Sequence, residues 1–418
     1  MKNWFLTLTF ILAIAASATA QTIYTLDSCK AIAVRGNLIL QNKKLAIESA
    51  KELKKEAFTK YFPNVTARGV GFWATDYLIN SDFDLGTFQT SFFSPVSISI
   101  DLPPIPIKMI RGGIIGNVMA VQPLFAGMRI VRGNQLAQLG VEAAKLQAQM
   151  SEDEVCQQVE YYYWQIVALQ KKLELLDTLD RQLTRIGHDV DAAVAAGVTT
   201  SNNQLQVKLK QQELASGKIR VLNGIKTYKA ILYQTAQLPA ADFDIADENL
   251  DMPAEPENLF IETQQGILQR TETQLLDMQV QAAELQTQMK IGEYLPQAVV
   301  GAGYNVPYFK VNDNNTSSNH FGLVFGMVTV PISDWWGGTH AIRQCRINEQ
   351  IARNERDNNL QLMAVQIQQA WNEVAEAYQQ LLIAQKSIEL AHENLRMQQD
   401  FFQAGTTTLT DLLNAQSM

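Results

Sequence analysis

The side chains most able to do chemistry are few and widely spaced. The chain holds four histidines: His188, His320, His340 and His392. None stands in a His-Glu-x-x-His pattern or beside a partner at metal-ligand spacing. Two Gly-x-Gly pairs, at 69–71 and 301–303, fall inside expected strands rather than at a strand-to-helix turn, so a dinucleotide site is disfavoured. There is also no nucleophile elbow or phosphate-binding loop, so the sequence predicts no enzyme and no cofactor.

The cysteines and the charge balance exclude further classes of function. The three cysteines are Cys29, Cys156 and Cys345. Their odd number and wide separation do not fit a disulfide framework or a metal-ligand pattern, so we expect them to be buried or half-buried fillers. The formal net charge of −8 argues against a nucleic-acid surface, which needs a clustered basic face.

The first twenty residues have the pattern of an export signal. Lys2 gives the positive start, residues 4–14 the short apolar stretch, and residues 18–20 a small-residue cleavage site before Gln21. No cysteine follows the cleavage site directly, so we expect the mature protein to be exported and non-lipidated. No later segment offers 18 uninterrupted apolar residues. The protein is then either soluble outside the inner membrane or set in the outer membrane by β-strands.

An internal repeat organises the elements that would position any functional side chain. Pro123 and Pro331 are 208 residues apart, and so are Gly197 and Gly405. A constant offset means that no residues are inserted or deleted between these marks. An earlier pair of marks, Pro63 and Pro296, has a longer offset, so repeat one carries 25 extra residues, which we expect to form a lengthened loop. The expected division is a signal at 1–20, repeat one at 21–238, a linker at 239–256 and repeat two at 257–418.

Each repeat is expected to run helix, two strands, very long helix, tight turn and returning helix. Repeat one has an apolar heptad row at Val155, Tyr162, Leu169, Leu176, Leu183 and Val190, with a second at Val159, Ile166, Leu173 and Val194. Repeat two has Ile367, Val374, Leu381, Ile388, Leu395 and Phe402, beside Met363, Ala370, Ala377, Ala384 and Ala391. These are coiled-coil positions. A helix over 129–195 would be about 100 Å long. The heptad rows alone fit an ordinary long coiled coil as well as any more specific architecture.

Short, glycine-rich strands favour a membrane protein. Phe321, Leu323, Phe325 and Met327 alternate with smaller or polar residues, and residues 114–121 and the segments after Pro63 and Pro296 are similar. Their lengths suit tilted membrane strands. Aromatic residues gather near the strand ends, as in interfacial girdles or in a small soluble sheet: Tyr61, Phe62, Phe72, Trp73, Tyr304, Tyr308, Phe309, Trp335 and Trp336. Four strands cannot close a membrane barrel, whose smallest members have about 8, so two or three chains would have to combine.

These features together resemble the TolC-like outer-membrane efflux proteins. The most specific segments are residues 122–127 (QPLFAG), where a strand turns into a helix, and residues 402–415 (FQAGTTTLTDLLNA), at the second helical turn. The resemblance implies a mainly α fold with membrane β-structure. Duplicated long coiled-coil hairpins would form an α-barrel, and four strands per chain would contribute to a trimeric 12-stranded outer-membrane β-barrel.

The same resemblance implies an exit duct for efflux or type I secretion. Its expected partners are two further copies of the chain, a periplasmic adaptor, an inner-membrane transporter and outer-membrane lipids, with no nucleic acid. The gate would lie at the periplasmic tip, at Gly197, Asn203, Gly405, Thr407, Asp411 and Asn414. Asp411 keeps a carboxylate that relatives often carry there, whereas Asn203, Asn414 and Thr407 replace charged residues. Asp411 could equally be a solvated first-turn residue favoured by the helix dipole.

Two rival functions remain on the sequence alone. A periplasmic structural or adaptor-like coiled coil without transport activity is the alternative function, and it would lack amphipathic membrane strands. A passive porin would show more strands and no long heptads. We also expect that the chain continues beyond Met418, because repeat two has almost no returning helix and its long helix would expose an apolar seam.

Overall fold

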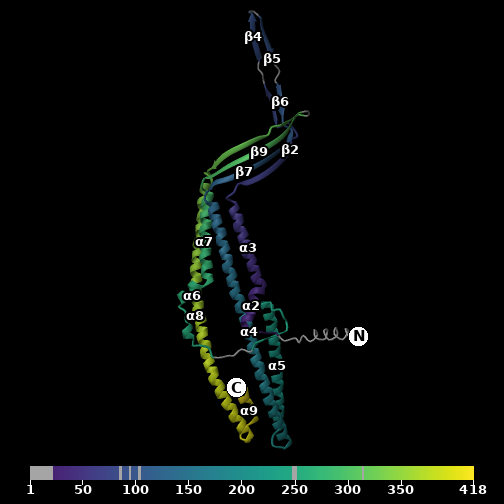
Figure 1. Cartoon of the computed structure of the whole chain (residues 1–418), viewed down its shortest axis with the longest axis vertical. Coiled ribbons are helices and arrows are strands. Elements are labelled where there is room, and N and C mark those ends of the chain that lie inside the picture. The colour runs from purple at the N-terminus through teal and green to yellow at the C-terminus, as the bar shows by residue number, and fades with distance from the viewer. Residues whose placement is uncertain (1–21, 84–86, 94–95, 102–104, 247–251, 313–314) are drawn as a thin grey trace, which may run out of the picture. The chain divides into compact units, whose positions relative to one another are not determined.

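The computed structural model describes residues 22–83, 87–93, 96–101, 105–246, 252–312 and 315–418 (Figure 1). The expected signal at 1–20 lies outside the described residues. The chain divides into two compact units. Unit 1 comprises Met1–Glu48, Glu142–Asp277 and Arg356–Met418, and unit 2 comprises Ser49–Val141 and Met278–Glu355. Each unit therefore takes residues from both halves of the sequence.

Unit 2 contains an antiparallel sheet made from the four expected strands. These are β2 (Asn64–Trp73), β7 (Gly112–Ala126), β9 (Gln297–Asn312) and β11 (Phe321–Thr329), in the order β2-β7-β9-β11. The short β10 (Asn315–Ser318) pairs with the last part of β9. Pairing of β7 with β9 joins the hairpins of the two sequence halves, from Gly112 opposite Lys310 to Ala126 opposite Gln297.

The extra residues of repeat one are strands, so the expectation of a lengthened loop was wrong for the described part. They form β3 (Ile79–Phe83), β4 (Thr87–Phe93), β5 (Val96–Asp101) and β6 (Ile105–Met109). β3 pairs with β6, and β4 pairs with β5, both antiparallel. In the sequence, Val96, Ile98 and Ile100 alternate with polar residues, which favours a strand. The nearby prolines concealed this signal.

The helices follow the expected plan closely. α3 (Leu38–Thr59) precedes β2, α4 (Arg129–Ala195) follows β7, and α5 (Ser201–Ala236) returns from the first turn. α7 (Thr271–Glu293) precedes β9, α8 (Asp334–Gln403) follows β11, and α9 (Leu409–Ser417) follows the second turn. α4 has the bounds expected for this helix, 129–195. None of the helices in the described ranges combines the length and apolar character that a membrane crossing requires.

Smaller elements complete unit 1. α2 (Leu26–Gly36) lies between β1 (Thr22–Tyr24) and α3, and β1 pairs in parallel with β8 (Phe243–Ile245). The 3₁₀ helix η1 (Pro256–Leu259) and α6 (Thr263–Gln269) precede α7. β8 falls within the segment expected to be a linker, at 239–256.

The main core of unit 1 is built on α4 and α5. Its largest fully buried side chains include Tyr163, Ile166, Leu232, Phe243 and Cys29. The heptad pattern placed Tyr162 in the core, but Tyr163 is fully buried and Tyr162 only half-buried. Here α4 is covered by several elements, so its buried stripe follows the wider helical spacing of Val159, Tyr163, Ile166 and Val167 rather than a strict seven-residue row.

The heptad rows of α8 differ along their length. Met363 is buried and accepts a bond from Thr273 Oγ1 at 3.7 Å. Further along, residues 381–390 are all exposed. Val374, Leu381 and Ile388 are 50%, 40% and 59% exposed. An apolar row is thus uncovered over this stretch of α8 in the single chain.

All three cysteines are free, and we expect them to differ in reactivity. Burial raises the pKa of the Cys29 thiol to about 11. Its thiolate is therefore scarce near neutral pH, and a thiolate is the reactive form. Cys345 is half-buried. In the native protein, an alkylating reagent should label Cys345 and spare Cys29, and unfolding should expose both, as peptide mass spectrometry would show. Equal native labelling of the two would contradict the burial of Cys29.

Candidate functional site

The two turns expected at the tip have the same backbone geometry. Gly197 and Gly405 have φ of 70° and 69°, the left-handed region that glycine adopts without strain. After α4, Val198 N–H donates to Ala193 O and Gly197 N–H to Val194 O, at 2.9 and 3.0 Å. After α8, the residues 208 positions later make the same two bonds, at 2.9 and 3.1 Å. Each long helix therefore ends in a Schellman motif closed by a glycine.

Asp411 stands in the first turn of α9 and completes its N-terminal cap. Thr408 Oγ1 accepts from Asp411 N–H at 3.2 Å, while Asp411 Oδ2 accepts from Thr408 N–H at 3.4 Å and from Thr408 Oγ1 at 2.6 Å. This is a capping box. The hydrogen bonds from Thr408 hold the pKa of the Asp411 carboxyl below its usual value. Asp411 is exposed, so its charge faces solvent in the single chain.

The other expected tip residues lie on both turns. Thr407 Oγ1 lies 3.3 Å from Asp411 Oδ2 and donates to Gln398 Oε1 at 3.0 Å. Asn414 is exposed on α9, one turn beyond Asp411. Asn203, the counterpart of Asp411 in the first repeat, is half-buried and donates through Nδ2 to Thr199 Oγ1 at 2.7 Å. The structure thus brings Thr407 to Asp411, while Asn203 bonds within its own turn.

A small apolar cluster packs the second turn against the first helical pair within unit 1. Leu409 and Leu413 of α9 are buried together with side chains of α4 and α5: Leu183, Val190 and Val207. Gln416 Nε2 also donates to Gln182 Oε1 at 3.1 Å. The expected tip residues therefore belong to one packed end of unit 1.

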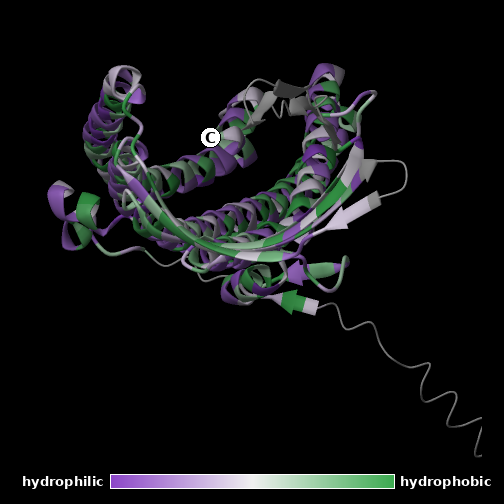
Figure 2. Ribbon diagram, turned by 90° about the horizontal axis from the view of Figure 1, so that it is seen from above, coloured by the Kyte–Doolittle hydropathy of each residue, from purple (hydrophilic) through white to green (hydrophobic). Residues whose placement is uncertain are grey.

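The sheet of unit 2 has one apolar face, defined by strand register. Residues paired across antiparallel strands share a face. The side chains of this apolar face are Val65, Ala67, Trp73, Ile114, Val118, Ala120, Ala298, Val300, Ala302, Tyr304, Val306, Tyr308, Val324 and Val328. Val324 and Val328 are 82% and 70% exposed. Among the residues of these strands whose side chains the structure describes, Gln122 and Lys310 are the polar residues of this face, and each lies near one end. The sheet is mostly green in Figure 2.

The opposite face, which we call the mixed face, carries the polar side chains of the sheet. On β2, β7 and β9 these are Asn64, Thr66, Arg68, Asn117, Gln297 and Asn305. The same face of β11 is apolar up to its last residue, Thr329, with Phe321, Leu323, Phe325 and Met327. Phe325 reaches across to Gly301, where a Cβ would lie 2.6 Å from its Cε1. A charged side chain thus lies midway along the mixed face, whereas the middle of the apolar face has none among the described residues.

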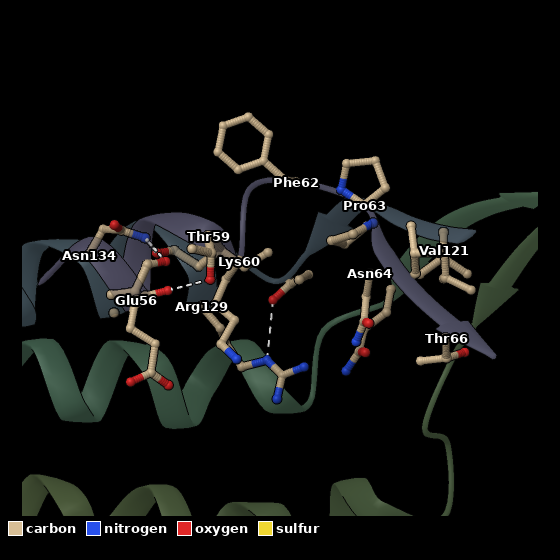
Figure 3. A pocket seen from close by; sticks show the side chains of 18 of the residues that line it. Glu56, Thr59, Lys60, Phe62, Pro63, Asn64, Thr66, Val121, Arg129 and Asn134 are labelled. Atoms are coloured by element: carbon tan, nitrogen blue, oxygen red, sulfur yellow. Dashed lines mark hydrogen bonds between the residues drawn. The ribbon is translucent and has the colours of Figure 1, made fainter. Parts of the chain in front are cut away.

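The mixed face also lines a cavity of about 1230 Å³ (Figure 3). Its wall combines the mixed face with the neighbouring ends of α3, α4 and α7. The polar lining includes Glu56, Lys60, Asn64, Arg68, Asn117 and Arg129. Arg129 Nε donates to Ala126 O at 3.3 Å, and Asn134 Nδ2 donates to Ala57 O at 3.0 Å, which fixes the start of α4. The Asn117 Oδ1 atom is buried without a hydrogen-bond partner. The polar part of this lining can hold water, and the rest of the lining is mostly apolar.

Two glycines allow close backbone packing at the strand-to-helix junction beside this cavity. Gly127 has φ of 63° and follows β7 directly. A Cβ on Gly127 would fall closer than 3.0 Å to the backbone of Gly292, and a Cβ on Gly292 would meet Gly127 in the same way. The turn into α4 and the last turn of α7 are therefore in backbone contact.

Sequence reasoning missed this contact, the cavity and the capping role of Thr408. Gly127 ended the recognised motif at 122–127, but no local pattern marks Gly292 as its partner. Thr408 could have been found, because a threonine three residues before an acidic residue is a capping signal. Within the described ranges, no three His, Cys, Asp or Glu side chains converge as metal ligands would.

Comparison with known proteins identifies this architecture. Residues 272–418 match the family model of the outer membrane efflux protein. The outer-membrane channel OprN is 13% identical with a TM-score of 0.74, covering 94% of this chain and 83% of OprN. The CmeC outer membrane channel of Campylobacter jejuni is 13% identical with a TM-score of 0.73, covering 94% and 79%.

A third solved structure agrees with these two. The outer membrane protein VceC of Vibrio cholerae is 12% identical with a TM-score of 0.71, covering 94% of this chain and 89% of VceC. No curated protein sequence matches the chain significantly. Likeness at this identity establishes the fold over nearly the whole chain. The chain therefore has the fold of these outer-membrane proteins over nearly its whole length, and its residues 272–418 match the outer membrane efflux protein family.

Proposed function

We propose that this protein is the outer-membrane exit duct of an efflux or type I secretion system. The observation that carries the proposal is the division of one sheet into an apolar face and a mixed face that lines a cavity. An apolar face with no charge in its middle suits lipid, and a mixed face that carries polar side chains and lines a cavity suits an aqueous lumen. The likeness to OprN, CmeC and the Neisseria gonorrhoeae channel MtrE, all named as outer-membrane channels, supports the same function.

The duct is a homotrimer in this proposal. The four principal strands of the sheet are too few to close a membrane barrel, and three chains would supply twelve. The exposed apolar row of α8, at Val374, Leu381 and Ile388, would be covered by packing among long helices in an α-barrel. The native mass of the detergent-extracted full-length protein tests this. A monomer or dimer would contradict it.

The duplication supports the same plan. Both turn glycines, both Schellman motifs and the starts of α5 and α9 differ by the same 208 residues. We therefore propose repeats at 21–238 and 257–418, joined by a segment at 239–256 that contributes β8 to unit 1. The packed tip would be the gated end, which meets a periplasmic adaptor and an inner-membrane transporter.

Cell fractionation tests the proposed location directly. The protein should be recovered with the outer membrane and should need detergent for extraction, because the apolar face would otherwise contact water. A periplasmic structural coiled coil would instead be released by osmotic shock. Such release of the correctly folded protein would refute the membrane duct.

Asp411 gives a prediction for the gate. Three exposed carboxylates around a narrow mouth would attract cations. Asp411→Asn should lower cation selectivity, measured as the reversal potential under a salt gradient in a planar bilayer. Thr408 lowers the pKa of each Asp411 carboxyl, whereas the neighbouring carboxylates of the mouth raise it, so cation selectivity should be lost as the pH falls and protons neutralise the three carboxylates.

The effect of the Asp411 charge on selectivity must be distinguished from the structural effect of the capping box of α9. Asn retains an acceptor for the Thr408 N–H, so the Asp411→Asn helix should remain capped. Thr408→Ala removes the capping hydroxyl and leaves the charge of Asp411 in place. Selectivity that falls in Thr408→Ala but not in Asp411→Asn would assign Asp411 a structural role alone.

A further inference from the structure

Two cations share one tryptophan ring at the far end of the sheet from its helices. Lys310 Nζ lies 5.5 Å from the Trp73 ring centroid, and Arg111 Cζ lies 5.7 Å from it. Arg111 is also 6.0 Å from the Tyr77 ring centroid. We name these four residues, Trp73, Tyr77, Arg111 and Lys310, the rim cluster. The connections to α3, α4, α7 and α8 all leave the opposite end of the sheet.

The backbone builds the rim cluster into the sheet. Gly112 pairs with Trp73 on one side and with Lys310 on the other, so the three lie in one row on the apolar face. The Trp73 ring covers Gly112, where a Cβ would lie 2.6 Å from Trp73 Cε3. Arg111 N–H donates to Lys310 O at 3.1 Å, and Arg111 O accepts from Ala74 N–H at 2.8 Å. The backbone of both cationic residues is therefore held by hydrogen bonds of the sheet.

The rim cluster offers both polar and apolar recognition. The Arg111 Nε atom is buried without a hydrogen-bond partner, so the base of the cluster holds an unsatisfied guanidinium donor. Trp73 is 64% exposed. On the same face, the next side chains toward the middle of the sheet are Ile114 and Tyr308, 61% and 50% exposed. Two cations thus lie directly beside exposed apolar surface.

We propose that the rim cluster binds the anionic phosphate headgroup of a membrane lipid whose acyl chains lie on the apolar face. A guanidinium fork matches phosphate oxygens, and a lysine adds a second positive charge. Free phosphate would use the cations but not the neighbouring apolar side chains. Aromatic and basic residues together at a membrane boundary suit this role. The inference rests on the proposed function, because it requires that the apolar face contact lipid.

Native mass spectrometry of the full-length protein, extracted in a neutral detergent, tests the inference. Retention of phosphatidylglycerol is compared with that of phosphatidylcholine carrying the same chains. The parent protein should retain phosphatidylglycerol preferentially. Arg111→Gln and Lys310→Gln should each lower this preference about fivefold, and the double variant should abolish it. Added inorganic phosphate should not compete, and competition by phosphate would assign the cluster to a free anion instead.

Matched controls separate the rim cluster from general charge. Arg68→Gln removes a cation from the mixed face of β2 and should leave the preference unchanged. Arg111→Lys keeps the charge and loses the guanidinium fork, so it should retain an intermediate preference for phosphatidylglycerol. This variant serves as the test if the double variant assembles poorly. An unchanged preference in the double variant, or an equal loss in Arg68→Gln, would overturn the inference. A protein that fractionates with the outer membrane yet shows no headgroup preference refutes this inference and leaves the proposed duct intact.

Discussion

Gly127→Ala should prevent assembly of the folded protein. The new Cβ would meet the backbone of Gly292, which has no flexible side chain to move aside, and alanine would also be strained at φ of 63°. Overpacking and backbone strain together should cost more than about 3 kcal/mol. The measurement is the yield of detergent-stable oligomer and its thermal unfolding midpoint.

The matched control is Gly140→Ala in the interior of α4. A Cβ at Gly140 would meet nothing within 4 Å, and alanine is a better helix former than glycine by about 1 kcal/mol. This variant should assemble at least as well as the parent protein. Gly292→Ala should behave like Gly127→Ala, because the two glycines face each other. Normal assembly of either junction variant would show that the turn into α4 and the end of α7 are not in backbone contact.

Val118→Lys should be far more damaging than Met119→Lys, although the two positions are adjacent on β7. Val118 lies on the apolar face, and Met119 lies on the mixed face and lines the cavity. A lysine on the lipid side of a membrane strand costs about 2–4 kcal/mol near the bilayer midplane, and a trimer would pay this cost in each chain. The amount of each variant inserted in the outer membrane measures the difference.

The two variants are controls for each other. Both add the same charge to the same strand, so a loss through strand propensity or expression would affect both. Similar insertion of the two, or better insertion of Val118→Lys, would contradict the assignment of the apolar face to lipid.

The long-range order of the fold could be predicted from the sequence because it depends on periodic patterns. The part of α4 from Val155 onward follows from its heptads, and its end follows from the turn glycine Gly197. The four principal strands could be predicted from the alternation of apolar with smaller or polar residues and from the prolines that mark the two repeats. Such signals repeat over many residues, so a local exception does not conceal them.

Contacts between distant residues could not be predicted in the same way. No sequence pattern relates Gly127 to Gly292, or Trp73 to Lys310, because their proximity depends on how β7 pairs with β9 and on the approach of α7. Tyr163 is buried instead of Tyr162 because several elements cover α4. For Asp411, both the charge and the first-turn position could be predicted from the sequence, but its bonds with Thr408 became visible only in the structure.

Single-channel current in a planar bilayer, with one cysteine as a reporter, tests the central claim most directly. Cys156 and Cys345 are replaced by serine, while the buried Cys29 stays, since its raised pKa makes it unreactive. A cysteine is then placed at Asn117 on the mixed face or at Val118 on the apolar face, and a charged water-soluble thiol reagent is added. A duct lined by the mixed face predicts discrete conductance that falls in steps for Asn117→Cys and stays constant for Val118→Cys. Absence of conductance from the assembled protein, or a response at Val118 rather than Asn117, would contradict it.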